Sequence, residues 1–499
     1  MLSLRAAAAI LGCSVVGDGT VVFDRVSSDS RDLRAGDLFV ALRGERFDGH
    51  GFIAGAAQAG AVAVLAESLP EGFSGNALVV PDTRVALGLL AEGWRRRFAL
   101  PVIGVTGSNG KTTVKEMLAA ILAAAVGETA RLATAGNLNN DIGTPLTTLR
   151  LHSGHQLAVI EMGMNHPGEI AQLARIAQPT VALVNNAQRE HQEFMQSVAA
   201  VAQENGSVFA ALPADGVAVF PAGTEFDALW RDLAGPRACR SFALDDGFVP
   251  GADGAGAESA GRADGAGAGA SAAAAASAAA DVIGHATPTA TGWSLSLTGA
   301  VEVAGIDLHL FGRHNALNAV AAAASAAAAG VGAEAIRAGL SAFRPVKGRL
   351  QAKVAALAPA TGARVLDDTY NANPDSVLAA IDVLAALPAP RVLVLGDMGE
   401  VGDNGPQFHA EVGAAARERG IDTLVTMGEL AREALAAFAN PGTPAPRHPQ
   451  PPAESAEQAA QAAAFAAGSG GSILVKGSRF MRMERVVAAL CGEAATGAH

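Results

Sequence analysis

The chain has 499 residues, a formal net charge of -12 at pH 7 and a hydrophobic fraction of 50%. That length is enough for two or three domains, each able to bury its own core. The negative charge argues against a general nucleic-acid-binding protein, because neutralising phosphates requires Lys and Arg, but it leaves room for a local cationic pocket.

The first block of the chain, residues 1–83, contains short apolar segments separated by turns rich in Gly and Asp. Segments of this kind predict β-strands with tight connections. The predicted strands are 21–23, 38–42, 62–65 and 77–80. We expect a small α/β domain here.

The second block, residues 84–343, alternates buried strands with helices. Its apolar runs are continuous rather than alternating, which is typical of parallel strands buried on both faces. The predicted strands are 101–105, 157–160 and 181–184, and the predicted helices are 84–97, 111–125 and 167–177, with Pro167 in the first turn of the last. Such alternation favours right-handed crossovers and a doubly wound sheet. Within this block, residues 251–280 are almost entirely Ala, Gly and Ser, which predicts a disordered surface insertion.

The third block, residues 344–499, repeats the alternation of strands and helices. Its predicted strands are 364–367, 391–395, 423–427 and 472–475, and 441–452 is a Pro-rich loop. The predicted fold is therefore α/β with three domains. A doubly wound, ATP-binding central domain would lie between a small N-terminal α/β domain and a Rossmann-like C-terminal domain.

The cysteines and apolar segments indicate the compartment. Cys13, Cys239 and Cys491 form neither a metal-binding spacing nor an even disulfide framework, which favours a reducing environment. The N-terminus lacks the features of a secretory signal, and the alanine-rich run 319–329 is too short and too weakly apolar to span a membrane. We expect a cytoplasmic protein without membrane insertion.

Residues 104–113, with the sequence GVTGSNGKTT, form the strongest local signal for function. A predicted strand enters the segment and a helix leaves it, so backbone N–H groups and the helix dipole can form an anion site. Gly107 and Gly110 allow close approach of phosphate oxygens. Lys111 can reach the β- and γ-phosphates, and the Thr112 hydroxyl suits Mg²⁺. The segment predicts a site for a nucleoside triphosphate.

The spacing of this loop is unusual, because five residues separate Gly104 from Gly110 where the common phosphate loop has four. The alternative is a chance glycine-rich turn. Strand, loop, lysine, hydroxyl and helix all agree, which favours the phosphate site.

Eight motifs in a fixed order carry a resemblance to the Mur ligases, the amide-forming enzymes of peptidoglycan synthesis. They are 27–31 (SSDSR) with 36–42 (GDLFVAL), the loop at Gly107, 136–143 (GNLNNDIG), 161–166 (EMGMNH), 312–318 (GRHNALN), 367–374 (DDTYNANP), 395–400 (LGDMGE) and 475–482 (VKGSRFMR). The last motif and the segment YNANP favour the member that adds D-alanyl-D-alanine to UDP-MurNAc-tripeptide. The resemblance implies ATP and Mg²⁺ as cofactors, an acyl-phosphate intermediate and a monomer.

The resemblance assigns nucleotide contacts on both sides of the loop. Asn315 and Asn318 lie three residues apart on a predicted helix, so they share a face, and their amides suit the edge of adenine; capping of the helix by Asn315 is the alternative. Arg349 and Asp368 match family positions by which the third domain closes over the nucleotide. The alternatives are a surface linker charge for Arg349 and a strand-end turn residue for Asp368. The predicted nucleotide contacts are Thr106, Gly107, Ser108, Asn109, Gly110, Lys111, Thr112, Thr113, Asn315, Asn318, Arg349 and Asp368.

A metal site is expected beside the loop. Glu161 ends an apolar strand, where α/β proteins bind ligands, and the resemblance makes it a Mg²⁺ ligand together with Thr112 and His191. The alternative for Glu161 is that its carboxylate caps the Gly163 turn. The alternative for His191 is that it is a solvated loop residue. Lys111, Glu161 and His191 are the predicted catalytic residues.

Substrate contacts are expected from all three blocks. Ser28, Ser30 and Arg31 are candidates for the diphosphate end, since Arg binds such groups with two hydrogen bonds; a solvated loop is the alternative. Asn137 and Thr144 are candidates for nucleotide or substrate, with turn formation as the alternative. The incoming amine is expected beside Asn371, Asn373 and Asp375.

One departure from the family concerns a lysine that many Mur ligases carbamylate to bridge metal ions. Asn205 stands where that lysine would fall, and no lysine occurs between Lys115 and Lys347. Metal binding is therefore predicted to proceed without a carbamate. The Asn205 carbonyl oxygen is a candidate substitute, and Glu204 is a nearby carboxylate.

Three other functions fit parts of the sequence. The first is a sibling ligase that adds diaminopimelate or lysine, or a folylpolyglutamate synthase, which a panel of amine donors would distinguish. The second is a nucleotide-binding regulator, whose ATP turnover would not depend on the acceptor. The third is a scaffold, whose function would survive Lys111→Ala.

Overall fold

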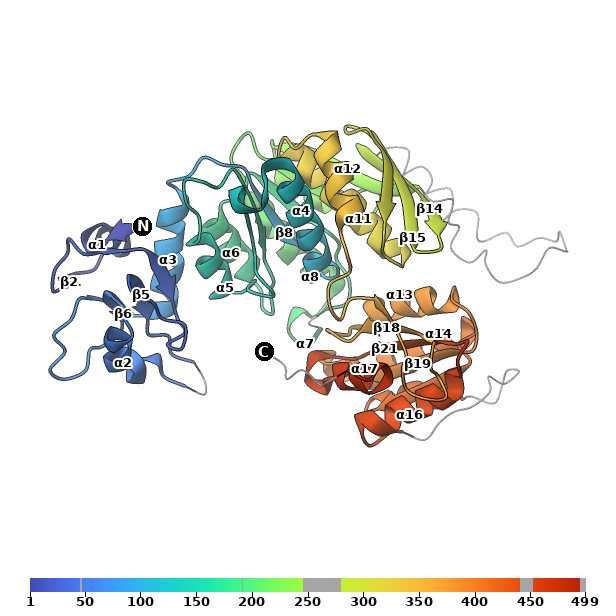
Figure 1. Ribbon diagram of the computed structural model, residues 1–499. Helices are drawn as coiled ribbons and strands as arrows, with labels where there is room; N and C mark the ends of the chain where they lie inside the picture. The colour runs from blue at the N-terminus through green and yellow to red at the C-terminus, as the bar shows by residue number, and fades with distance from the viewer. Residues whose placement is uncertain (45–46, 191, 246–279, 440–451, 494–499) are drawn as a thin grey trace.

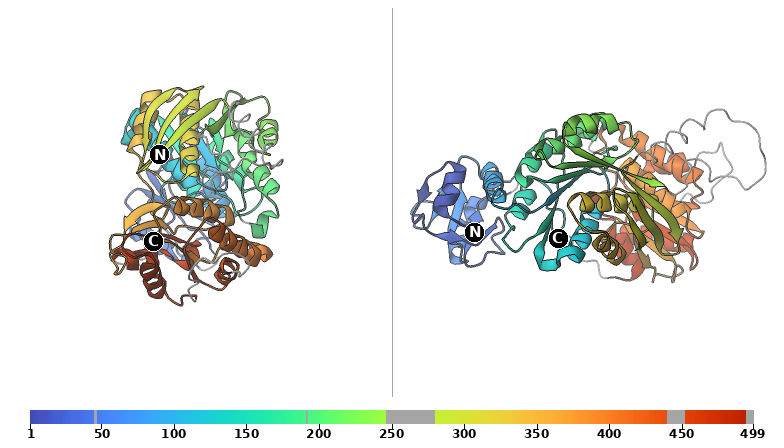
Figure 2. Two further views of the ribbon diagram at one scale, coloured as in Figure 1. Left: turned by 90° about the vertical axis from the view of Figure 1, so that its right-hand side faces the viewer. Right: turned by 90° about the horizontal axis from the view of Figure 1, so that it is seen from above.

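The computed structural model describes residues 1–44, 47–190, 192–245, 280–439 and 452–493. Three α/β domains follow one another along the chain, with the N-terminal domain at one end of the molecule and the C-terminal domain against the far part of the central one (Figures 1 and 2). The predicted fold class is confirmed. The predicted insertion 251–280 and the Pro-rich loop 441–452 lie almost entirely outside the described residues.

The N-terminal domain is built on a five-stranded sheet in the order β2-β7-β6-β5-β4, in which only β2 runs antiparallel to its neighbour. Three of the four predicted strands belong to it, and the segment predicted over 21–23 instead pairs with the N-terminus as β3. The strands are β1 (Leu2–Ser3), β2 (Val15–Val16), β3 (Val22–Phe23), β4 (Arg25–Ser27), β5 (Asp37–Val40), β6 (Ala63–Ala66) and β7 (Ala77–Val79), and the helices are α1 (Leu4–Leu11) and α2 (Ile53–Gln58).

The central domain has a nine-stranded sheet in the order β16-β15-β14-β13-β12-β11-β8-β10-β9. Its strands are β8 (Val102–Thr106), β9 (Arg131–Ala133), β10 (Leu157–Glu161), β11 (Val181–Val184), β12 (Val217–Pro221), β13 (Ala238–Asp245), β14 (Val282–Thr289), β15 (Gly292–Gly299) and β16 (Val303–Leu308). Neighbours from β9 to β14 are parallel, as predicted for β8, β10 and β11. The sequence had not indicated β9, β12 and β13, nor the antiparallel extension that β14, β15 and β16 form.

Helices cover both faces of this sheet (Figure 1). Along β8, Val102 packs into one core while Ile103 and Val105 pack into the other, because successive side chains of a strand point to opposite faces. One face carries α4 (Lys111–Val126), α11 (Arg313–Ala328) and α12 (Ala333–Ala342). The other carries α3 (Thr83–Arg95), α5 (Gly143–Thr148), α6 (Glu169–Ala177), α8 (Val198–Gly206) and α9 (Asp227–Ala234), and the short α7 (Gln192–Met195) precedes α8.

The start of α6 differs from the prediction. Pro167 lies before the helix, and Gly168 is its N-cap with a left-handed φ of 92°. The carboxylate of Glu204 accepts hydrogen bonds from the N–H groups of Gly168 and Ile170 at 2.9 Å each. Glu204 therefore caps the N-terminus of α6, where the helix dipole favours a negative charge.

The C-terminal domain has a five-stranded sheet in the order β17-β18-β21-β19-β20, parallel except for β17. All four predicted strands are present. The strands are β17 (Gln351–Val354), β18 (Arg364–Asp368), β19 (Arg391–Gly396), β20 (Thr423–Met427) and β21 (Ser472–Lys476), and the helices are α13 (Pro374–Ala385), α14 (Gly405–Glu418), α15 (Ala431–Phe438), α16 (Ala456–Ala467) and α17 (Glu484–Cys491). Among the described helices of the whole chain, none combines the length and apolar character that crossing a bilayer demands.

Gly339 allows α12 to pack directly on α4, the helix that leaves the phosphate loop. A Cβ at Gly339 would lie 2.4 Å from the Cα of Ile121, and backbone atoms cannot move away cheaply. We predict that Gly339→Ala lowers the free energy of unfolding by about 1–3 kcal/mol, the usual cost of overpacking. Urea unfolding measures this directly. Gly332→Ala, at the start of the same helix with open space around its Cβ, is the control, and equal losses in both variants would contradict the prediction.

Candidate active site

A cavity of about 810 Å³ lies between the central and C-terminal domains. On the central side it is bounded by the carboxyl ends of β8, β10 and β11, and on the other side by those of β18 and β21. The sheet order places β10 and β11 on opposite sides of β8. Open parallel sheets bind ligands where the strand order reverses in this way.

The phosphate loop connects β8 to α4 and turns at two glycines with positive φ, Gly107 (127°) and Gly110 (82°). Its first N–H groups already have protein acceptors. The N–H of Gly107 donates to Asn205 Oδ1 at 3.0 Å, that of Ser108 to Asn186 O at 3.1 Å, and that of Asn109 to Asn186 Oδ1 at 2.8 Å. These three N–H groups thus have protein acceptors in this structure, and phosphate binding by the loop stays a prediction. The first turn of α4 adds N–H groups of the kind that a helix leaves without intrahelical partners.

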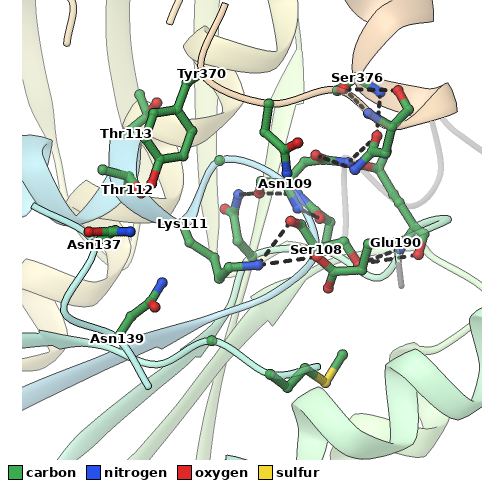
Figure 3. A pocket seen from close by; sticks show the side chains of 18 of the residues that line it. Ser108, Asn109, Lys111, Thr112, Thr113, Asn137, Asn139, Glu190, Tyr370 and Ser376 are labelled. Atoms are coloured by element: carbon green, nitrogen blue, oxygen red, sulfur yellow. Dashed lines mark hydrogen bonds and ion pairs between the residues drawn. The ribbon is translucent and has the colours of Figure 1, made fainter. Parts of the chain in front are cut away.

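Lys111 points back over the loop. Its Nζ donates to the carbonyl oxygens of Gly107 at 2.5 Å and Ser108 at 3.0 Å, and it forms an ion pair with Glu190 Oε2 at 3.2 Å. Figure 3 shows Lys111 turned toward Ser108 and Glu190. The cation is therefore held within the loop, where phosphate oxygens would compete for it. Ser108 through Thr113 line the cavity, whereas Thr106 is buried and donates to Asn205 Oδ1 at 2.7 Å.

Glu161 is buried at the end of β10 with the geometry of a cation ligand. Its Oε1 accepts hydrogen bonds from Thr112 Oγ1 at 3.1 Å and Asn139 Nδ2 at 2.8 Å. Its Oε2 is buried and has no hydrogen-bond partner in the described residues. The Gly163 turn is closed by the carbonyl of Asn139 instead, so Glu161 does not cap it.

The orphaned carboxylate oxygen and the Thr112 hydroxyl are hard donors that fit Mg²⁺, which completes its shell with water and phosphate oxygens. His191 lies outside the described residues. In the parts of the chain that are described, no three His, Cys, Asp or Glu side chains gather around one point.

The two residues suggested in place of the missing lysine, Asn205 and Glu204, have protein partners in this structure. Asn205 Oδ1 accepts from Thr106 and Gly107 and fixes the start of the phosphate loop. Glu204 caps α6. Both groups thus accept hydrogen bonds from the protein in this structure, and cation binding by either of them stays a prediction.

Asn315 and Asn318 share a face of α11, as predicted, and both line the cavity. Asn318 donates to Asn315 Oδ1 at 3.2 Å and accepts from Asn185 Nδ2 at 2.8 Å. Asn315 donates to Phe311 O at 2.8 Å. The N-cap of α11 is Gly312, so capping by Asn315, the alternative, is not observed.

Arg349 and Asp368 bring the C-terminal side to the loop. Arg349 Nη2 donates to Thr112 Oγ1 at 2.9 Å, and its guanidinium lies 4.2 Å from the centre of the Tyr370 ring. Asp368 accepts from the N–H of Leu350 at 3.1 Å and pairs with Lys476 Nζ at 2.7 Å. Arg349 is thus a contact between domains rather than a solvated linker charge.

The residues predicted for the incoming amine also line the cavity. Asn373 is the N-cap of α13, and its Nδ2 donates to Asn109 Oδ1 of the phosphate loop at 2.9 Å. The side-chain oxygen of Asn371 accepts from the N–H of Ala372 at 2.9 Å. The carboxylate of Asp375 is bound by Arg189 at 2.6 Å, so its charge is already compensated.

The structure separates two groups of predicted residues from this cavity. Ser28, Ser30 and Arg31 lie in the N-terminal domain after β4, and the exposed Arg31 pairs with Asp29 at 2.8 Å. Asn137 lines the cavity. Thr144 does not, because its side chain is fully buried within α5; the expectation that it touches a ligand is not met in this structure.

Several cavity residues have no role predicted from the sequence, among them Glu190, His314 and Lys476. His314 and Lys476 lie inside quoted motifs, so their neighbourhood was a signal that could have found them. Burial lowers the pKa of the His314 imidazole to about 4, with Asp368 opposing and Lys476 reinforcing the shift. Glu190 follows β11 by several residues, and only the fold brings it to Lys111.

Comparisons with known proteins match the chain in three stretches. Residues 105–326 match the Mur ligase middle domain, 348–479 the glutamate ligase domain of Mur ligases, and 23–95 the Mur ligase family catalytic domain. A UDP-N-acetylmuramoyl-tripeptide–D-alanyl-D-alanine ligase of Escherichia coli is 39% identical over 471 residues, 94% of each chain.

Solved structures agree with this match. A crystal structure of MurF from Acinetobacter baumannii superposes with a TM-score of 0.82 at 32% identity, covering 98% of this chain and 99% of that one. MurF from Thermotoga maritima in complex with ADP superposes with a TM-score of 0.74 at 25% identity, covering 96% and 99%.

The lowered pKa of His314 predicts a pH effect on stability. Burial lowers its pKa to about 4 in the folded chain, while an unfolded histidine titrates near 6.5. Between these values the unfolded state binds the additional proton, so stability falls as the pH drops from about 6.5 to about 4. We predict that lowering the pH over this range reduces the free energy of unfolding less in His314→Gln than in the wild type. Denaturant titrations at several pH values measure it, and parallel curves for the two proteins would contradict the assignment.

Proposed function

This chain belongs to the Mur ligase family, and from that membership we propose how its cavity makes an amide bond. It is an ATP-dependent, ADP-forming ligase that joins D-alanyl-D-alanine to UDP-MurNAc-tripeptide in peptidoglycan synthesis. The observation that carries this assignment is the agreement with relatives of that name along 94% of the chain. Sibling ligases and a regulatory nucleotide switch, the alternatives from sequence, are disfavoured.

The first step transfers a phosphoryl group to the acceptor. A carboxylate oxygen of the tripeptide bonds to the γ-phosphorus of ATP, the bond to the β,γ-bridging oxygen breaks, and ADP leaves. Negative charge on the transferred group requires fixed cations and donors. We assign this role to Lys111 and the first turn of α4 from one side and to Arg349 from the other.

Magnesium fits the end of the loop. Thr112 and Glu161 would hold the ion, and His191 stays a proposed third ligand. The bound ion would neutralise phosphate charge. The buried, unpartnered Oε2 of Glu161 supports this proposal, because a lone buried carboxylate oxygen is costly without a partner. Asn139 holds the other carboxylate oxygen at 2.8 Å and so orients the ligand.

The second step forms the amide. The amine nitrogen of D-alanyl-D-alanine bonds to the acyl carbon, the bond from that carbon to the phosphate oxygen breaks, and phosphate and a proton are released. We place the donor beside Asn371 and Asn373, at the C-terminal wall of the cavity. Asn315 and Asn318, which line the cavity from α11, are proposed for the adenine.

The acceptor is long, and its uridine diphosphate end is proposed to reach the N-terminal domain at Ser28, Ser30 and Arg31, outside the cavity. We propose the domain bounds 1–83, 84–343 and 344–499. We also propose a monomer in the cytoplasm, since the domains of one chain supply the whole cavity.

The assignment predicts a defined donor preference. With ATP and UDP-MurNAc-tripeptide, D-alanyl-D-alanine should give a kcat/KM at least about a hundredfold above that for diaminopimelate or lysine, as is usual for sites that discriminate through polar contacts. Phosphate release measures the rate. Turnover with diaminopimelate but not with D-alanyl-D-alanine would overturn the substrate assignment.

Two controls accompany this panel. Omitting the acceptor should abolish phosphate release, whereas acceptor-independent turnover would favour a regulatory ATPase. Lys111→Ala should lower turnover by about a thousandfold with folding preserved, in the range seen when a stabilising donor is removed.

The absence of lysine between Lys115 and Lys347 predicts that activity does not depend on bicarbonate. Removing dissolved carbon dioxide and adding back bicarbonate should change kcat by less than about twofold, because the central domain offers no lysine beyond the phosphate-loop helix to carbamylate. Mass spectrometry of the intact chain should find no additional carboxylate. Rescue by bicarbonate together with a carboxylated lysine would contradict this expectation.

A further inference from the structure

Arg189 joins the central domain to the C-terminal domain. It lies on the loop after β11, five residues beyond the strand end at Val184. Its guanidinium binds two carboxylates of the other domain, Asp375 at the start of α13 and Glu411 on α14. We call Arg189, Asp375 and Glu411 the interdomain cluster.

The geometry of the interdomain cluster is that of a strong ion pair. Asp375 accepts from Arg189 Nε at 3.0 Å, Nη2 at 2.6 Å and the backbone N–H at 2.8 Å. Glu411 accepts from Nη1 at 2.7 Å and Nη2 at 3.0 Å. The guanidinium also lies 5.3 Å from the centre of the Phe408 ring, and hydrogen bonds to Glu411 and Asp375 raise the pKa of Arg189.

Exposed ion pairs contribute little to stability, but this pair is not freely exposed. The side chains of Arg189 and Asp375 retain only 23% and 21% of their accessible surface. Two hydrogen bonds to each carboxylate use the planar fork of arginine, which lysine cannot reproduce. The contact is therefore specific in geometry as well as in charge.

The residues on either side of Arg189 contact the phosphate loop. The N–H of Gln188 donates to Ser108 Oγ at 2.8 Å. The side-chain oxygen of Gln188 accepts from Asn109 Nδ2 at 2.7 Å. Glu190 pairs with Lys111. Segment 188–190 thus binds the loop with two residues and the C-terminal domain with the third.

The interdomain cluster lies beside the groups that the C-terminal side brings to the cavity. Asn373, two residues before Asp375, contacts Asn109, and Arg349 contacts Thr112. The linker 343–350, between α12 and β17, is where the chain passes from one domain to the other. A rotation of the C-terminal domain about this linker would separate Asn373 from the phosphate loop unless the interdomain cluster opposed it.

We infer that Arg189 is a positioning residue that holds the C-terminal domain over the phosphate loop, so that Arg349 and the donor site meet the transferred phosphoryl group. This inference rests on the proposed function for its kinetic consequence. Its structural consequence, docking of the two domains, is independent of which amine is the donor.

The test uses the full chain with Arg189→Ala, Arg189→Lys, Glu411→Ala and the double variant Arg189→Ala with Glu411→Ala. Arg231→Ala is the matched control, because Arg231 also pairs with an aspartate, Asp227, and lies 5.1 Å from a phenylalanine ring, but within the central domain. Small-angle X-ray scattering reports domain docking, calorimetry the affinity for ADP, and phosphate release the values of kcat and KM for D-alanyl-D-alanine.

Arg189→Ala should increase the radius of gyration and lower kcat/KM for D-alanyl-D-alanine by about tenfold, equivalent to 1.4 kcal/mol, while ADP affinity changes less than twofold. For Arg189→Lys, the radius of gyration and kcat/KM should lie between those of Arg189→Ala and the wild type. The double variant should resemble Arg189→Ala, because coupled residues are not additive. The control should match the wild type in all three measurements.

Scattering and kcat/KM of Arg189→Ala that both equal the wild type would overturn the inference. An equal loss of ADP affinity would also overturn it, since Arg189 would then act on nucleotide binding. A wild-type chain that does not use D-alanyl-D-alanine would refute only the proposed function, because scattering still decides whether Arg189 docks the domains.

Discussion

Parallel strands end together at one edge of a sheet, and this chain turns two such edges toward each other. The central sheet contributes the ends of β8, β10 and β11, and the C-terminal sheet those of β18 and β21. Side chains at strand ends are held by rigid backbone, so Glu161, Asp368 and Lys476 are fixed before any ligand arrives. The site depends on this juxtaposition, and each domain alone has only half of it.

Strands β8, β10 and β11 and the parallel strands of the C-terminal sheet could be predicted, because buried parallel strands leave a continuous apolar signal. Glu161 is conspicuous because a carboxylate interrupts such a run. Strands β14 to β16 escaped prediction because exposed and buried positions alternate along them irregularly. The partners of Lys111 and Arg189 escaped it because they lie 79 and 186 residues away, and no local pattern encodes such pairings. The hydrogen bonds of the loop amides also depend on side chains from other strands.

Asn205 supports the phosphate loop although it does not line the cavity. The Asn205 amide holds the N–H of Gly107 and the hydroxyl of Thr106, so it stabilises the entry to the phosphate loop directly. Positive charge beside the loop comes from Lys111 and Arg349.

Polar groups of the cavity satisfy one another across the domain boundary and within the loop. Lys111 pairs with Glu190, Asn318 accepts from Asn185, and Asn109 contacts Asn373. A ligand must exchange each of these bonds for one of its own, so the net gain per contact is only about 1 kcal/mol. Affinity then depends on making many exchanges at once, which only a ligand of the right shape can do. Because Asn373 and Arg349 belong to the C-terminal side, those exchanges couple ligand binding to the position of that domain.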